Sequence, residues 1–191
     1  MALFFDIEIA KQDHLDPKDY DMLREEIPWF DFMPEYNKII CISYVDSSDW
    51  ATHSLIGDED GIIKEFMNII EKSDKLCGYN ILWFDIPFVA KRSVILWLPI
   101  VQKIKAHDVK PWNTTHILDL FLVWKHWSMK ACNLDTLCNA LDIPTPKDKM
   151  DGSQVDTYYR YGHIDEIRQY CEKDVIACVK VWKRFVETNL I

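Results

Sequence analysis

The sequence predicts an α/β fold in which a mixed sheet of five strands is flanked by helices. Residues 3–10, 38–45 and 50–56 are apolar segments bounded by polar turns, as expected for strands that form an initial meander. Further along the chain, short apolar strands alternate with segments of helical periodicity. Strands that alternate with helices after a meander are typical of mixed sheets covered by helices.

Each remaining element follows from its local pattern. Residues 11–35 are polar, acidic and interrupted by prolines, so we expect a long loop with one helical turn near residues 20–26. Residues 153–161 are expected to lead directly into the last helix. The other expected elements are a turn over residues 46–49, helices over residues 58–72, 84–95, 134–143 and 163–188, a strand over residues 75–80, a strand that turns helical within residues 116–127, and a polar loop over residues 144–152.

Composition narrows the class of protein. The 191 residues are 49% apolar, so we expect a single domain over residues 1–191 with a substantial core. The net charge of −9 argues against broad binding of duplex nucleic acid, and no apolar run reaches the roughly 18 residues of a membrane span. The six cysteines form no C-x-x-C pair and the start MALFFDIE lacks a basic signal region, so we expect an intracellular, cytoplasmic protein.

Asp6 and Glu8 form an acidic pair inside the first apolar strand. Residues two apart point to the same side of a strand, about 7 Å apart along it, so the two carboxylates can clamp a cation. The alternative is an ordinary strand whose polar face meets water.

Asp85 is a third acid in an apolar context. It follows Trp83 and Phe84 at the junction between a predicted strand and a predicted helix. It can be a metal ligand, or it can cap the helix, since aspartate is a preferred N-cap residue. Asn80 can likewise be a turn residue.

Tyr170 and Asp174 lie four residues apart, so they share one face of the last predicted helix, beside an apolar stripe. A buried acid is costly unless a cation or hydrogen bonds compensate it. Asp174 can therefore be a metal ligand, or it can lie at the edge of the stripe and pair with Lys173 or Arg168.

Together these segments resemble the DEDD, or DnaQ-like, 3′–5′ exonuclease superfamily. FFDIE is similar to its first motif, residues 80–85 to its second and residues 170–174 to its third. Because the third motif holds Tyr170 where other members hold a histidine, the resemblance is to the tyrosine subgroup, which includes the proofreading domains of family-B DNA polymerases. The segments MPEYNKIICIS and GYNILWFDIPFVAKR are similar to small family-B-like exonucleases. The resemblance implies an RNase H-like fold with Asp6 and Glu8 on the central strand.

The resemblance also implies a two-metal site. Its metal ligands would be Asp6, Glu8, Asp85 and Asp174, holding two Mg²⁺ or Mn²⁺ ions. Asp6 would bridge both ions, Glu8 and Asp174 would hold the ion on the nucleophile side, and Asp85 would act on the other ion, partly through water. Tyr170 would orient the nucleophilic water, so all five residues would be catalytic.

The implied substrate is the 3′ end of single-stranded nucleic acid, which would be shortened to nucleoside 5′-monophosphates. Ile7, Asn80 and Phe84 are the candidate substrate-binding residues. DNA is favoured, and the alternatives are an exoribonuclease with the same site, a non-catalytic nucleic-acid-binding module on the same fold, or an acidic protein–protein adaptor. Because no polymerase segment accompanies the motifs, we do not expect proofreading within the same polypeptide; the protein can act alone or as a subunit of a larger assembly, and no membrane partner is expected.

Three further features have both a structural and a functional interpretation. Asp119 can support the metal site or end a strand, and the aromatic loop from Trp29 to Tyr36 can stack bases or cover an edge of the core. A local group of basic residues can contact phosphates or be solvated surface. This group comprises Lys91, Arg92, Lys103, Lys105 and Lys110.

Overall fold

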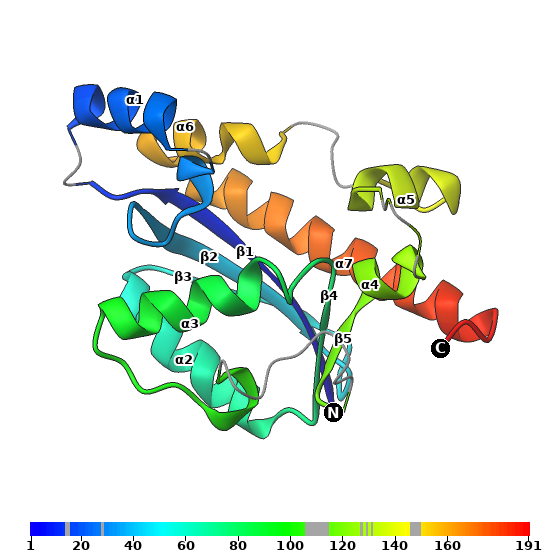
Figure 1. The fold of residues 1–191 in the computed structure, drawn as a ribbon. Helices are drawn as coiled ribbons and strands as arrows, with labels where there is room; N and C mark the ends of the chain where they lie inside the picture. Colours follow the sequence, from blue (N-terminus) through cyan, green and yellow to red (C-terminus); the bar gives the residue numbers. More distant parts are fainter. Residues whose placement is uncertain are drawn as a thin grey trace.

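The centre of the protein, seen in a computed structural model, is one five-stranded sheet in the order β3-β2-β1-β4-β5 (Figure 1). The residues that the structure describes are 1–13, 16–27, 29–105, 115–126, 128, 130, 132–145 and 150–191. The strands are β1 (Ala2–Lys11), β2 (Asn37–Asp46), β3 (Thr52–Ile56), β4 (Lys75–Gly78) and β5 (Ile117–Asp119). The helices are α1 (Pro17–Glu26), α2 (Glu59–Lys72), α3 (Asp85–Ile95), α4 (Leu120–Lys125), α5 (Leu134–Ala140), α6 (Val155–Arg160) and α7 (Ile164–Glu187), with 3-10 turns at Phe30–Phe32, Gln102–Ile104 and Gly152–Gln154.

The sheet is mixed, as the sequence predicts. β1 pairs with β2 antiparallel and with β4 parallel, β2 pairs with β3 antiparallel, and β4 pairs with β5 parallel. The two chain reversals through β2 and β3 form the expected meander, and crossovers through α2 and α3 supply the parallel strands. The strand that carries the acidic pair is therefore the central one.

Helices cover both faces of the sheet, with α2 and α3 on one face and α7 on the other (Figure 1). Side chains of β1 alternate between these layers. Phe5 packs in a cluster with residues of α2 and α3, whereas Phe4 and Ala10 pack in clusters with residues of α7. By the same alternation Asp6 and Glu8 face α7, in the gap between two apolar clusters.

Two helical segments differ from the sequence-based expectation. The single turn predicted near residues 20–26 is a ten-residue helix, α1, because Asp16 caps its start and Tyr20 buries its ring against Phe30. Residues 153–161 do not run directly into the last helix. The short helix α6 ends first, and Gly162, at a φ of 78°, turns the chain before α7 begins.

Candidate metal-dependent active site

The acidic pair on β1 lies where the strand meets α7. Glu8 is buried at 8% exposure and Asp6 is partly exposed. One carboxylate oxygen of each and the Cys171 sulfur lie within 4.8 Å of one another. The Cys171 Sγ lies 3.4 Å from the Asp6 carbonyl oxygen and 3.5 Å from Asp6 Oδ2, so this thiol from α7 contacts the acid directly.

A bulge in the sheet lies beside this pair. Glu8 pairs with Cys41, but Ile9 pairs with Ile39, so Ile40 is an extra residue in β2. Bulges of this kind re-aim neighbouring side chains and are frequent next to active sites.

Asp85 approaches the pair from the start of α3. It is 2% exposed, and its Oδ1 accepts a hydrogen bond from the Ile7 amide at 3.2 Å, between the two acids of β1. The alternative that Asp85 is an N-cap is wrong: Asp85 is the first residue of the helix, Phe84 takes the cap position, and no side chain caps that end.

Asp119, at the end of β5, holds the turn that leads to Asp85. Its two carboxylate oxygens accept from the amides of Asn80 at 2.8 Å and Leu82 at 3.0 Å. Gly78 precedes this turn, and a Cβ there would lie 2.9 Å from the Phe5 carbonyl oxygen, so only glycine fits. Asp119 also ends β5 and caps α4, so the structural role considered for it is confirmed, whereas support of a metal site stays a prediction.

Tyr170 and Asp174 complete the cluster from α7. They are one helical turn apart, and the Tyr170 side chain, 8% exposed, is hydrogen-bonded to Asp174. On the same helix, Arg168 bonds Glu172 at 2.6 Å and Asp165 at 3.5 Å.

The raised pKa values of these acids show that they lie close enough to repel one another. Burial raises the pKa values of Asp6 and Glu8 well above the usual range, and repulsion from Asp85 and Asp174 raises them further. Asp6 keeps some exposure, but it lies deep enough among packed groups for desolvation to dominate. Burial likewise raises the pKa of Asp85 to about 7, against the lowering effect of backbone hydrogen bonds that include the Ile7 amide.

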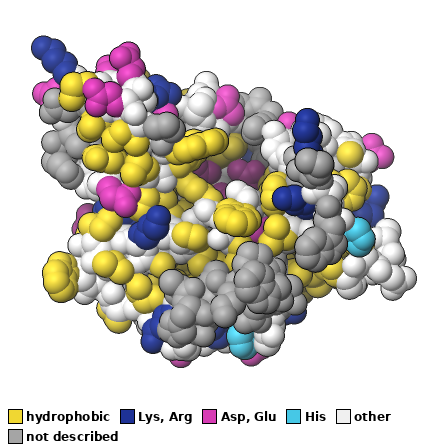
Figure 2. Space-filling model, in the orientation of Figure 1, with side chains coloured by type: hydrophobic (Ala, Val, Ile, Leu, Met, Phe, Trp, Pro, Cys, Tyr) yellow, Lys and Arg dark blue, Asp and Glu magenta, His cyan; other side chains and the backbone are white. Residues whose placement is uncertain are grey.

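The donor set of the cluster fits a hard divalent cation. Among the described residues, no lysine or arginine forms an ion pair with Asp6, Glu8 or Asp85. Figure 2 shows acidic side chains recessed in a hollow that hydrophobic side chains surround, so the floor of this face is open to a ligand. Repelling carboxylate oxygens at such a position are the ligands that Mg²⁺ and Mn²⁺ prefer.

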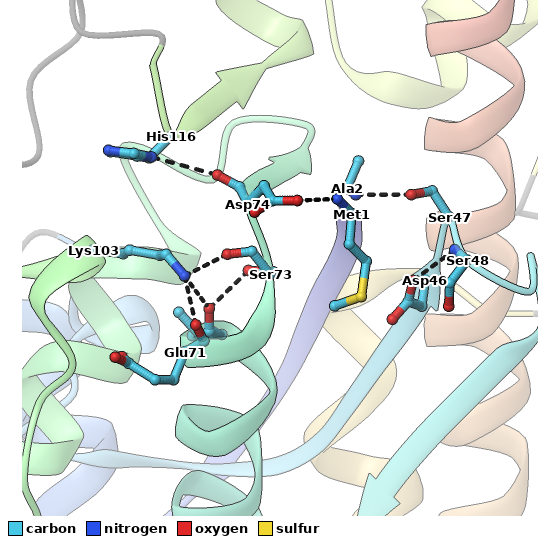
Figure 3. A network of polar contacts seen from close by, with 11 residues as sticks. Met1, Ala2, Asp46, Ser47, Ser48, Glu71, Ser73, Asp74, Lys103 and His116 are labelled. Atoms are coloured by element: carbon cyan, nitrogen blue, oxygen red, sulfur yellow. Dashed lines mark hydrogen bonds and ion pairs between the residues drawn. The ribbon is translucent and has the colours of Figure 1, made fainter.

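Two of the basic residues considered for phosphate binding have structural roles instead. Arg92 is buried, bonding Glu59 at 2.7 Å and the Pro34 carbonyl oxygen at 2.8 Å. Lys103 donates to carbonyl oxygens at the end of α2, including that of Glu71 at 2.8 Å, in a polar network that also includes the start of β1 (Figure 3). A prediction of phosphate contact by these two side chains is therefore wrong. Lys110 lies outside the described residues.

The candidate substrate-binding residues lie in different environments. Asn80, at a φ of 66°, and Phe84 are both partly exposed. Ile7 is 4% exposed and packs in the core shared with α2 and α3, while its amide is bonded to Asp85. The Ile7 side chain is therefore enclosed in the core, and the assignment of Ile7 to substrate binding stays a prediction.

The mixed five-stranded sheet, with acids brought to its central strand from α3 and α7, defines an exonuclease domain of the RNase H-like type. The chain belongs to the family described as a predicted 3′–5′ exonuclease related to the exonuclease domain of PolB, whose model matches residues 30–189. The match includes Asp85, Tyr170 and Asp174, whereas Asp6 and Glu8 precede it.

A solved structure has the same fold. The family B DNA polymerase from the hyperthermophilic archaeon Pyrobaculum calidifontis superposes with a TM-score of 0.71 over 99% of this chain, at 17% sequence identity. The chain spans 25% of the length of that polymerase. A search of curated proteins gave no match. In the described part of the chain, no helix is both long and apolar enough to cross a membrane. The predicted resemblance and fold class are therefore confirmed.

Without divalent metal, we expect the protein to unfold at a lower temperature at about pH 8 than at about pH 5.5. The pKa of Asp85 is about 7 in the folded state, and an unfolded aspartate titrates near 4, so the folded state binds more protons between these values. Stability is therefore lost as pH rises through this window. Thermal unfolding followed by circular dichroism in EDTA measures the difference, and excess Mn²⁺ should restore stability at about pH 8.

The control is Asp85→Asn, which keeps an oxygen acceptor for the Ile7 amide and removes the charge. Its unfolding temperature in EDTA should depend less on pH. If the wild-type protein in EDTA were equally stable at both pH values, burial would not raise the pKa of Asp85 in the folded state.

Proposed function

We propose that residues 1–191 act as one domain that removes nucleoside 5′-monophosphates from the 3′ end of single-stranded nucleic acid, with DNA favoured. The observation that carries the proposal is the meeting of Asp6, Glu8, Asp85 and Asp174 from three separate elements. Family membership supports the proposed polarity of the reaction, and the acidic cluster supports this position for the active site.

The four acids would together hold two Mg²⁺ or Mn²⁺ ions. Bound there, such ions stabilise charge on the scissile phosphate and lower the pKa of the attacking water. Asp6 is repelled by each of the other three acids, which supports its inclusion among the residues that would hold the ions. Ile7 contributes through its amide, which fixes Asp85 relative to the acids of β1.

Tyr170 would orient the nucleophilic water through a hydrogen bond at its hydroxyl oxygen. Burial, followed by repulsion from Asp174, raises the pKa of this phenol above its usual range, so it cannot act as a base at neutral pH. Its hydroxyl therefore remains protonated, as a positioning role requires.

Asn80 and Phe84 would contact the terminal nucleotide at the rim of the site. Both residues lie in the turn before Asp85 that Asp119 fixes through two backbone amides, so their side chains are held close to Asp85. A partly exposed phenylalanine ring offers a face to a base, and the asparagine amide offers hydrogen bonds to the sugar or phosphate.

The first test is a nuclease assay on 3′-labelled and 5′-labelled DNA and RNA oligonucleotides with Mg²⁺, Mn²⁺ or EDTA. We expect stepwise shortening from the 3′ end with metal, none in EDTA, and preference for a 3′ single-stranded tail over a blunt duplex. Asp6→Ala and Asp174→Ala should abolish hydrolysis, because each removes a metal ligand, and should leave metal-free stability unchanged or raised, because each relieves repulsion.

The matched control is Asp165→Ala, which removes an exposed acid from the same helix as Asp174 and should keep full activity. Hydrolysis by the Asp174→Ala protein at the wild-type rate would rule out this site. Faster cutting of RNA than of DNA would favour the exoribonuclease alternative, and binding without hydrolysis would favour the non-catalytic module.

A second variant, Tyr170→Phe, keeps the buried ring and removes only the hydroxyl. Positioning of a water contributes at or below the lower end of the roughly 10²–10⁴-fold range for acid–base groups. We therefore expect kcat to fall by up to about 10²-fold, with Mn²⁺ affinity measured by calorimetry little changed. A variant with wild-type kcat would mean that Tyr170 only fills space in the core.

A further inference from the structure

The loop that follows α1 is anchored to the body of the protein by the buried side chain of Phe30. Phe30 is buried at 1% exposure, with its ring centroid 4.6 Å from that of Tyr20 and 4.4 Å from that of Tyr36. The Asn37 amide group donates to the Phe30 carbonyl oxygen at 3.1 Å, and Arg92 donates to the next part of the loop at Pro34. The backbone of this loop is therefore held against the body of the protein.

Two other aromatic side chains of the same loop point outward. Trp29 is 78% exposed and Phe32 is 55% exposed, with their ring centroids 6.4 Å apart. Trp29 also has a left-handed backbone, at a φ of 65°, which is costly for a residue that is not glycine. Single exposed aromatics are common on protein surfaces. A pair presented by an anchored loop and held next to a catalytic cluster is a more specific arrangement.

These rings are continuous with the acidic cluster. The Phe32 ring meets the Phe84 ring edge to face, at a centroid distance of 5.9 Å. Phe84 directly precedes Asp85, which is bonded to the β1 backbone between the acids. A line of aromatic rings thus leads from the surface to the metal ligands, and Figure 2 shows hydrophobic side chains bordering the hollow with the acidic floor.

We propose that Trp29 and Phe32 form a stacking platform for the unpaired bases that precede the terminal nucleotide of the substrate strand. This inference rests on the proposed function and adds the residues that would bind the nucleotides preceding the 3′-terminal one. The chain has a net charge of −9, and Arg92, the cation that bonds this loop at Pro34, is engaged inside the protein, so few phosphate contacts are available there. Stacking on aromatic faces is independent of base identity and requires single strands. It can therefore supply the affinity that phosphate contacts do not.

The test is binding of a fluorescein-labelled single-stranded oligonucleotide, in DNA and RNA forms, followed by anisotropy with Ca²⁺ in place of Mg²⁺. Trp29→Ala and Phe32→Ala should each weaken binding about 5-fold or more, the effect expected when one stacked base loses its ring. Trp29→Phe retains a ring and should recover most of the affinity. In steady-state hydrolysis, the alanine variants should raise KM with little change in kcat.

Trp97→Ala is the matched control. Trp97 is 94% exposed and also has a left-handed backbone, at a φ of 57°, but it follows the far end of α3, about 15 Å along that helix from Asp85. The Trp97→Ala protein should bind oligonucleotides with the affinity of the wild-type protein. A second control removes the bases: on a strand with abasic sites at the second to fourth positions from the 3′ end, Trp29→Ala should cause no further loss.

Unchanged oligonucleotide affinity and KM in both Trp29→Ala and Phe32→Ala would overturn the platform and assign these rings to a protein contact. Equal losses in Trp29→Ala and Trp97→Ala, or an undiminished loss on the abasic strand, would also overturn it. The proposed function fails separately, if the wild-type protein releases no nucleotide from any 3′ end.

Discussion

Repulsion among carboxylates at the contact between β1 and α7 is the constraint on which the rest of the structure depends. Burying carboxylates that repel one another costs several kcal/mol, so a cluster of four would drive these elements apart unless other contacts held them. Apolar clusters on both sides of Asp6 and Glu8 join the central strand to the helix. Packing therefore keeps the four carboxylates close together. A bound divalent metal ion would offset the free-energy cost of their mutual repulsion.

Backbone contacts fix the acids with little reliance on flexible side chains. The Ile7 amide holds Asp85, and Asp119 holds the turn before it through two backbone amides. Sites built on strands and helices and supported by such contacts keep their geometry when the ligand is absent. The aromatic loop is supported in a similar way, because the Phe30 side chain is buried while Trp29 and Phe32 remain exposed. Rigid support of this kind suits the proposed removal of one nucleotide after another.

Local patterns were enough to predict the first strand and the shared face of Tyr170 and Asp174, because periods of two and of about 3.6 residues fix those directions. The central position of that strand was implied by the family resemblance. Contacts between distant residues could not be predicted in this way. Arg92 resembles a surface cation in the sequence, yet its partner Glu59 lies 33 residues away. Asp85 resembles a helix cap, yet its hydrogen bond goes to a residue 78 positions earlier. The length of α1 was missed because its polar sequence conceals the burial of Tyr20.

Diffraction from crystals soaked in Mn²⁺, with anomalous difference maps, tests most directly whether the acids form one metal site. We predict two anomalous peaks, both in contact with Asp6 and together contacting Glu8, Asp85 and Asp174. Mn²⁺ bound only at exposed surface acids such as Asp165, with the central-strand acids uncoordinated, would contradict the metal site. It would leave the buried carboxylates as protonated structural groups.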